Sequence, residues 1–219
     1  LYVAEYDARS IAEIDPITAR VTRRIAAGTW PLDIAFAPDG TTLVVADFPM
    51  NEVVLVDVES GRELRSIAVA RQPFSVAVDS ARELVVVSNL LPHTSAQDRA
   101  QAAAISIVDL VDLADVAHIA LPAGSTNVRQ VAIAPDGLAY VAHTIGRNHL
   151  PTTQVERGWV NTNAVSIIDP RLGKRIGTML LDYLFEGAAN PWGVAISPDG
   201  GRLWVSIAGA HQIAEIDLS

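Results

Sequence analysis

The amino-acid sequence predicts an all-β protein, a β-propeller built from four-stranded antiparallel blades. Three observations favour this fold. Sequence features recur at spacings of 42 to 60 residues, the apolar runs are short and β-branched with turn residues at their ends, and helical periodicity is almost absent. A doubly wound α/β fold would need a helix between successive strands, and the connections leave no room for one.

The first repeated feature is an apolar run that ends in aspartate. It occurs five times, with spacings of 42, 52, 60 and 48 residues between the aspartates. A carboxylate at a strand end can accept the N–H groups of the following turn, so we interpret these residues as structural. The residues excluded from any site on this ground are Asp15, Asp57, Asp109, Asp169 and Asp217, with Asp39, Asp136 and Asp199 of the Pro-Asp-Gly turns.

The second repeated feature is an apolar-Ala-apolar run followed by a turn, and a third apolar run follows each turn. Pro-Asp-Gly forms three of these turns, because Pro sets φ, Asp caps the turn and Gly accepts a positive φ. Each full unit therefore consists of strand A, a tight turn, strand B, a connection, strand C, a turn and strand D. The predicted D strands are Val21–Ile25, Leu64–Val69, Val116–Leu121 and Lys174–Leu181.

The repeats divide the chain into five units. We expect a partial blade at residues 1–27, blade units at 28–70, 71–122 and 123–182, and a partial blade at 183–219. These units give about 4.5 blades. The first unit lacks strand A, the last lacks strand D, and both contain B and C, so they cannot merge into one blade. We therefore expect part of a larger ring, such as one of seven blades; an open or unusual five-bladed ring is the alternative. The one helical expectation is about two turns at Ser95–Ala104.

Composition excludes several classes of protein. Half of the 219 residues are apolar, which is enough for a sizeable core, and the net charge of −9 disfavours non-specific nucleic-acid binding. The chain has no cysteine, so it holds no disulfide, no thiolate metal site and no c-type haem attachment. No apolar run reaches the roughly 18 residues of a membrane span. The chain starts inside a predicted strand without a signal peptide, and we expect it to be cut from something longer.

Several of these motifs carry a family resemblance. The strands Leu1–Glu5 and Ala139–Ala142, the Pro-Asp-Gly turns and the Ile-Asp strand ends resemble the Tyr-Val-Thr-Asn (YVTN) repeat family of propellers, which includes surface-layer proteins. The resemblance covers essentially the whole chain. It implies a bacterial or archaeal protein that is exported to the periplasm or the cell exterior, and a binding or scaffold role without chemistry of its own.

The insertions resemble a narrower subgroup of periplasmic propellers. The segments that carry this likeness are Asn89–Pro92, Gly124–Arg129, Pro151–Gln154, Glu156–Trp159, Asn161–Ala164 and Phe185–Ala189. That subgroup is often associated with c-type cytochrome or di-haem peroxidase-like modules. Since this chain has no haem motif, the resemblance implies that any haem belongs to a partner.

The lengthened connections are predicted to share one side of the propeller. In this fold the B–C and D–A connections open on one side, and the A–B and C–D turns open on the other. The extra length lies in the B–C connections Ser88–Ala104 and His143–Ala164 and in the D–A connection Asp182–Asn190. Function concentrates in loops held on a rigid scaffold, so the long-connection side is the predicted functional side.

Histidines are the candidate metal ligands. Four of the five are predicted in B–C connections: His93, His143, His149 and His211. Imidazole is the commonest metal ligand, so these residues could hold copper, zinc or iron. The alternative is that they are separate surface or loop-structuring residues, because no His-x-His pair forces them together. His118 lies in a D strand and is interpreted as surface or structural.

Polar and aromatic residues supply the candidate binding surface. Arg157, Trp159, Asn161 and Asn163 suit a polar ligand or a protein partner, since Trp and Arg dominate binding hot spots. The alternative is a self-packed loop in which Trp159 covers the core and the two asparagines satisfy loop backbone groups. The cations Arg129 and Arg147 either bind an anion or pair with Asp98, Glu156 and Glu186.

Side chains at the starts of the A strands are predicted to lie near the central channel. Trp192 occupies the position that Leu32, Phe74 and Arg129 fill in the other units. Trp30, Asp33, Phe74, Arg129 and Trp192 are predicted to ring the channel mouth on the long-connection side, with packing between blades as the alternative.

The leading functional hypothesis is a non-catalytic, exported scaffold that docks a protein partner, such as a cytochrome or peroxidase module, through its long-connection side. No Gly-x-Ser-x-Gly, His-Glu-x-x-His, Gly-rich phosphate loop or Asp-rich calcium loop is present. The alternative is a metal-binding or enzymatic propeller, redox or lactonase-like, with a His/Arg site at the axial channel. The predicted binding residues are His93, Arg129, His143, Arg147, His149, Arg157, Trp159, Asn161, Asn163, Glu186 and Trp192.

Overall fold

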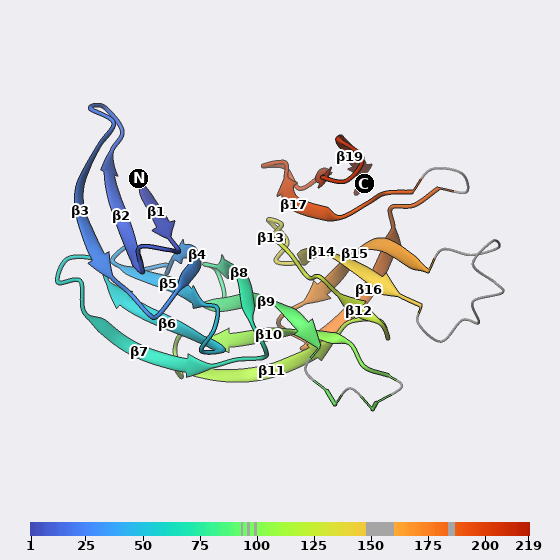
Figure 1. The fold of residues 1–219 in the computed structure, drawn as a ribbon, viewed down its shortest axis with the longest axis horizontal. Coiled ribbons are helices and arrows are strands. Elements are labelled where there is room, and N and C mark those ends of the chain that lie inside the picture. Colours follow the sequence, from blue (N-terminus) through green and yellow to red (C-terminus); the bar gives the residue numbers. More distant parts are fainter. Residues whose placement is uncertain (93, 96, 99, 148–159, 184–186) are drawn as a thin grey trace.

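A computed structural model describes residues 1–219 except 93, 96, 99, 148–159 and 184–186. The described residues form β-strands and turns, and none of them is helical. Five antiparallel sheets follow one another in an arc, with the two chain ends on opposite sides of its opening (Figure 1). The predicted all-β propeller of antiparallel blades is confirmed. None of the described residues belongs to a helix long and apolar enough to cross a membrane.

Strands that follow one another in the chain pair within each sheet, except that β12 and β13 of the fourth sheet both pair with β14. The first sheet contains β1 (Tyr2–Glu5), β2 (Ser10–Asp15) and β3 (Arg20–Ala26). The second contains β4 (Pro31–Phe36), β5 (Thr42–Asp47), β6 (Glu52–Asp57) and β7 (Glu63–Ala68). The third contains β8 (Pro73–Asp79), β9 (Leu84–Pro92), β10 (Ala103–Asp109) and β11 (Ala114–Ala120).

The fourth and fifth sheets complete the arc. The fourth contains β12 (Ser125–Thr126), β13 (Val131–Ile133), β14 (Ala139–Gly146), β15 (Asn161–Asp169) and β16 (Lys174–Leu180). The short strands β12 and β13 both pair with β14, so together they form one interrupted A strand. The fifth sheet contains β17 (Pro191–Ile196), β18 (Arg202–Ile207) and β19 (Gln212–Asp217). The residue boundaries of the predicted units and the size of a closed ring stay predictions.

The A strands lie at the inner edge of the arc. Strand β4 contacts β8, β8 contacts β13, and β13 contacts β17. Figure 1 shows these strands around the centre, while β3, β7, β11 and β16 lie on the outside. Side chains at the starts of different A strands are therefore brought together near the axis, although they are far apart in the sequence.

The core lies between neighbouring sheets. Apolar side chains of the first two sheets form one cluster, and similar clusters join the second to the third, the third to the fourth, and the fourth to the fifth. A sheet in the middle of the arc is covered on both faces, so β5 is buried along its whole length. Removal of this apolar area from water is the main favourable term in such a fold.

The turns on the side opposite the long connections are held by their own aspartates. Asp15 accepts the Ile17 N–H at 2.9 Å, Asp39 accepts the Thr41 N–H at 2.8 Å, and Asp109 accepts the Val111 N–H at 2.7 Å. The Thr18 hydroxyl and the Ile17 N–H lower the pKa of Asp15. These carboxylates accept hydrogen bonds from the backbone of their own turns, which agrees with their structural interpretation. We call this side the plain side.

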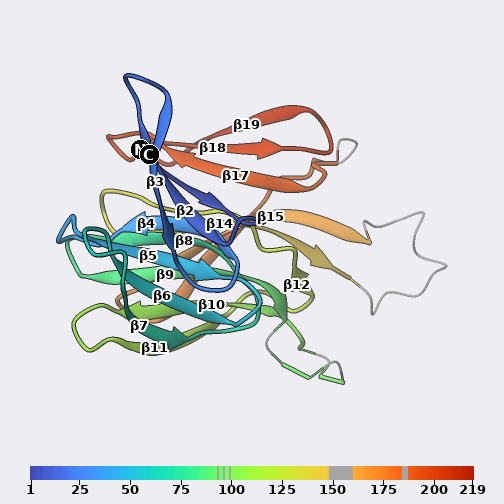
Figure 2. The same ribbon diagram turned by 60° about the vertical axis from the view of Figure 1, so that its left-hand side comes forward.

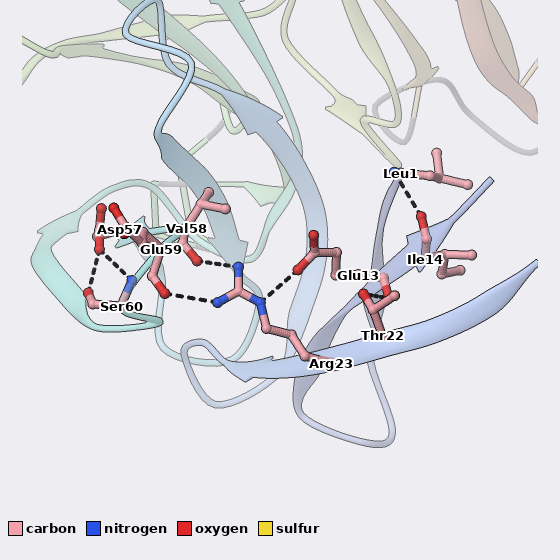
Figure 3. A network of polar contacts seen from close by, with 9 residues as sticks. All are labelled: Leu1, Glu13, Ile14, Thr22, Arg23, Asp57, Val58, Glu59 and Ser60. Atoms are coloured by element: carbon pink, nitrogen blue, oxygen red, sulfur yellow. Dashed lines mark hydrogen bonds and ion pairs between the residues drawn. The ribbon is translucent and has the colours of Figure 1, made fainter. Parts of the chain in front are cut away.

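An arginine joins two sheets on the plain side (Figure 3). Arg23 of β3 donates from Nε to the Glu13 carboxylate at 2.6 Å. Its terminal nitrogens donate to the main-chain oxygens of Val58 at 2.5 Å and Glu59 at 2.9 Å, in the turn after β6. The guanidinium thus connects the first sheet to the second.

The strand ends bordering the two long B–C connections share one side of the arc. Figure 2 shows β9 and β14 running toward the side that carries β12, and β10 and β15 starting from it. The connections are shorter than predicted, because His143–Gly146 pair with Asn161–Ala164 and Ala103 pairs with Pro92. The prediction that Ser88–Ala104 and His143–Ala164 are loops throughout is therefore wrong at both ends. Apolar and β-branched residues, such as Leu90 and Ile145, favour continuing the ladder.

The helix expected at Ser95–Ala104 is a second correction. The described residues there form turns, in which the Asp98 N–H donates to the Ser95 oxygen at 2.9 Å and the Gln101 N–H donates to the Asp98 oxygen at 3.1 Å. Residues Ala103 and Ala104 belong to β10. A helix this short is marginal even in an Ala-rich sequence, whereas strand pairing satisfies the same backbone groups.

Candidate axial binding site

Three of the inner strands are preceded by a residue in the left-handed backbone conformation. Gln72, Asn127 and Asn190 have left-handed conformations, with φ of 58°, 53° and 55°. Two residues after each of them stand Phe74, Arg129 and Trp192, respectively. Because the same backbone conformation precedes each of these inner strands, Phe74, Arg129 and Trp192 occupy equivalent positions at the inner edge of their sheets.

These three side chains form one cluster. The guanidinium carbon of Arg129 lies 4.0 Å from the ring centroid of Trp192 and 4.8 Å from that of Phe74. The two rings meet edge to face, with their centroids 5.8 Å apart. A cation over an aromatic face is attracted by the negative face of the ring, so both rings hold the guanidinium.

The fourth sheet fixes the backbone of Arg129. Its N–H donates to the Ala142 oxygen at 2.9 Å, and its own oxygen accepts the Ser88 hydroxyl at 2.5 Å. Ser88 belongs to β9 of the third sheet and is fully buried. The backbone of Arg129, which lies between β12 and β13, is therefore hydrogen-bonded to both the third and the fourth sheet.

The charge of Arg129 has no counter-charge in the described part of the chain. Its guanidinium forms no ion pair or hydrogen bond there, and its Nε is buried without an acceptor. Burial lowers the pKa of Arg129, but an arginine in a protein remains protonated. The cluster therefore presents a positive charge held by aromatic rings.

A hollow of about 240 Å³ adjoins the cluster. Four successive sheets contribute to its lining, which consists of Leu32, Asp33, Phe74, Ser75, Gln130 and Trp192. Trp192 remains 42% exposed, so an aromatic surface is open to a ligand or partner. This combination of a cation, aromatic faces and a hollow is the strongest candidate site in the described residues.

The residues that follow the cluster positions join the inner strands to one another. Asp33 accepts the Val76 N–H at 3.0 Å, Ser75 accepts the Val131 N–H at 3.4 Å, and Gln130 accepts the Val194 N–H at 3.1 Å. Each bond links one sheet to the next and so fixes the lining of the hollow. Our sequence interpretation missed Ser75 and Gln130. Asp33, Ser75 and Gln130 directly follow Leu32, Phe74 and Arg129, which are equivalent positions of the repeat. That all three are polar is the sequence signal that could have identified them.

The structure separates the other described candidates from this cluster. Arg147 and Asn161 are exposed at the end of β14 and the start of β15, on the long-connection side. Trp30, predicted at the channel mouth, instead stacks on Tyr6 with ring centroids 5.8 Å apart. That contact is packing between the first and second sheets.

Asn163 has a role inside the fold. It is buried in β15, where its N–H donates to Asp182 at 2.5 Å and its Nδ2 donates to the same carboxylate at 3.1 Å. Its Nδ2 also contacts the main-chain oxygen of Ala188. Burial raises the pKa of Asp182. These contacts are those of the structural alternative, in which the asparagine satisfies loop groups.

His143 is a correction to the sequence interpretation. It lies in β14 and is fully buried, so the prediction that it belongs to a B–C connection is wrong. Its Nε2 lies 2.8 Å from the Ser166 hydroxyl, and burial lowers its pKa to about 4. His143 continues the strand because it pairs with Ala164 of β15. The spacing of the repeats did not reveal that this pairing extends so far.

The remaining histidines do not form a metal site with it in the described part of the chain. His211 is exposed in the turn before β19, and the described residues contain no group of three His, Cys, Asp or Glu suited to a metal ion. His118 of β11 lies 3.1 Å from the Ser106 hydroxyl and 3.0 Å from the Asp115 carboxylate. The candidates His93, His149, Arg157, Trp159 and Glu186 lie outside the described residues.

The chain is similar to known proteins in sequence and in fold. No protein-family model matches the chain. A curated relative, the β subunit of hydrazine synthase from Kuenenia stuttgartiensis, is 36% identical over 96 residues, which cover 43% of this chain and 25% of the relative. The match thus spans about a quarter of that protein's length.

A solved structure of hydrazine synthase from Kuenenia stuttgartiensis is also similar. It superposes with a TM-score of 0.63 and 23% identity, over 99% of this chain and 73% of the matched chain. At this identity the likeness shows the fold, and it supports the β-propeller predicted from the repeats.

Proposed function

We propose that this chain is a non-catalytic scaffold propeller that docks a protein partner within a multi-subunit assembly. The observation that carries the proposal is the shared side of the strand ends that border the long B–C connections (Figure 2). The aspartates of the plain side accept hydrogen bonds from their own turns, whereas the long-connection side exposes Arg147 and Asn161 at the end of β14 and the start of β15. Loops on a rigid scaffold are the usual place for recognition.

The comparison with curated proteins supports a subunit role. The relative that shares 36% identity over 96 residues is named as a subunit of a synthase. A subunit acts through its contacts with other chains. By analogy, the exposed residues of the long-connection side would lie against another chain of the assembly.

Two finer statements belong to the same proposal. The partner is a c-type cytochrome or peroxidase-like module that carries any haem, and the assembly works in the periplasm or outside the cell. The resemblance of the insertions to periplasmic propellers supports both statements, and the lack of cysteine in this chain supports the placement of any c-type haem on the partner. Cell fractionation of the full-length protein, followed by haem staining of its co-purifying partners, tests them together.

Co-expression with the products of neighbouring genes tests the docking role. We expect one of them to form a complex that is stable in size-exclusion chromatography with light scattering. The double variant Arg147→Ala/Asn161→Ala should weaken this complex at least about tenfold, which corresponds to a loss of about 1.4 kcal/mol and is less than the roughly 2 kcal/mol of one hot-spot residue. Lys174→Ala, at an exposed position of the plain side, is the matched control and should leave the affinity unchanged.

Each other outcome has a definite meaning. If no neighbouring product binds, the scaffold proposal is wrong. If a complex forms but only Lys174→Ala weakens it, the plain side is the docking side. Stoichiometric copper, zinc or iron in the purified chain would instead favour the metal-binding alternative.

A further inference from the structure

We infer that the axial cluster is a binding site for a carboxylate group. Arg129 supplies the positive charge, Trp192 and Phe74 lie against its guanidinium, and the same two rings line the neighbouring hollow, which would receive the rest of the ligand. The inference does not rest on the proposed function, because a carboxylate can bind here whether or not a protein partner docks.

The geometry leaves the donors of Arg129 available. The two aromatic rings lie against the guanidinium, with their centroids 4.0 and 4.8 Å from its central carbon, and an aromatic ring takes no conventional hydrogen bond from its N–H groups. Nε is buried, whereas the two terminal nitrogens are not among the buried polar atoms and form no bond to a described residue. Two parallel N–H donors at one end of a guanidinium match the two oxygens of a carboxylate.

The charge balance favours a carboxylate over a phosphate. Arg129 is the one cation of the cluster, and Asp33 adds a negative charge to the lining of the hollow. Each oxygen of Asp33 already accepts a backbone N–H, from Ile34 at 2.9 Å and from Val76 at 3.0 Å. A ligand with one negative charge is neutralised by Arg129, whereas a phosphate dianion would keep an unpaired charge beside Asp33.

The size of the hollow sets the class of ligand. A space of about 240 Å³ holds a short acid or a single acidic side chain. The same chemistry therefore comes from two sources, a free small carboxylate or a Glu or Asp side chain of a polypeptide. The exposed face of Trp192 adds apolar contact to the ligand's methylene groups.

Titration of the isotope-labelled chain tests the inference by NMR. The probes are sodium acetate and a blocked tri-glutamate peptide, each compared with its uncharged amide, acetamide or tri-glutamine. We expect saturable shifts of the Trp192 indole N–H, assigned with Trp192→Phe, for the acids and none for the amides. Binding should weaken at least tenfold in Arg129→Gln and several-fold in Arg129→Lys, which keeps the charge but loses the fork.

Controls keep the test decisive. Arg20→Gln, an exposed arginine in the outer strand of the first sheet, should bind like the unmodified chain. If Arg129→Gln does not fold, Arg129→Lys carries the comparison. Tighter binding of the peptide would identify an acidic side chain as the source, and equal or tighter binding of acetate would identify a free acid. Equal shifts with the amides, no saturation with either acid, or full binding by both Arg129 variants would overturn the site.

Discussion

Two arginines show how differently the two sides of this propeller are built. Arg23 on the plain side donates to one carboxylate and two main-chain oxygens, and every one of these bonds lies within the fold. Arg129 at the axis has two aromatic rings as neighbours and no hydrogen bond from its guanidinium to a described residue. The first arginine joins two sheets, whereas the guanidinium donors of the second have no acceptor among the described residues.

The same contrast extends to the carboxylates. Aspartates at the strand ends of the plain side accept N–H groups of their own turns, so they hold the scaffold and offer nothing to a ligand. At the inner edge, side chains of four sheets converge on one hollow. The polar groups that line this hollow also have internal partners, so the group there without a described partner is the Arg129 guanidinium.

The largest expected effect comes from a glycine beside the long connections. Gly124 has φ of +85°, and a Cβ there would lie 2.0 Å from the Gly146 oxygen. Gly124→Ala should therefore reduce the free energy of unfolding by about 4 kcal/mol, from backbone strain and overlap together. Urea denaturation measures the loss.

A plain-side glycine is the matched control for Gly124. Gly40 has φ of +69°, but nothing lies within 4 Å of an added Cβ. Gly40→Ala should therefore cost about 1 kcal/mol, from strain alone. Equal losses for the two variants would mean that the connection around Gly124 is not packed as described.

The second prediction concerns how the free energy of unfolding depends on pH. His143 has a pKa of about 4 in the folded chain, below its ordinary 6.5. The unfolded chain therefore takes up a proton first, so this contribution to stability is complete above pH 6.5 and is lost as the pH falls toward 4. The loss amounts to about 3 kcal/mol. Asp15 on the plain side has a lowered pKa, so its contribution disappears only below its ordinary value of 3.8.

Unfolding curves at pH 7 and 4.5 separate these two windows. His143→Asn, which copies Asn89 at the same position of the third sheet, should remove most of the pH dependence between these values. Ser166→Ala keeps the imidazole and loses its hydroxyl partner, so it should retain the dependence. An unchanged slope in His143→Asn would show that the imidazole is not sequestered.

The repeats predicted the fold because they report local chemistry. Strand ends, Pro-Asp-Gly turns and β-branched runs are set by neighbours in the sequence, and the structure has strands at the β-branched runs and turns at the Pro-Asp-Gly segments. The site was harder, because Phe74, Arg129 and Trp192 meet only through the curvature of the arc. The burial of His143 likewise depends on strand pairing that extends beyond the repeat, which no local pattern encodes.

The third prediction measures how strongly the rings hold Arg129. A double-mutant cycle of Arg129→Gln and Trp192→Leu should give a coupling free energy of about 1 kcal/mol, the range for a partly exposed cation over an aromatic ring. Thermal or urea unfolding of the four proteins provides the values. A coupling near zero would show that the ring does not stabilise the cation in solution.

The smallest expected effect concerns Arg23 and its response to salt. Arg23 and Glu13 are 38% and 32% exposed, so their attraction is screened by ions and partly offset by ordering two side chains. Arg23→Gln should therefore lower the melting temperature slightly at low salt and less at 1 M NaCl. The Arg129–Trp192 coupling should change less over the same range, because the ring excludes water from one face of the guanidinium. If salt weakened both arginines equally, the axial cation would be as solvated as the plain-side one, and its rings would not distinguish it as a binding group.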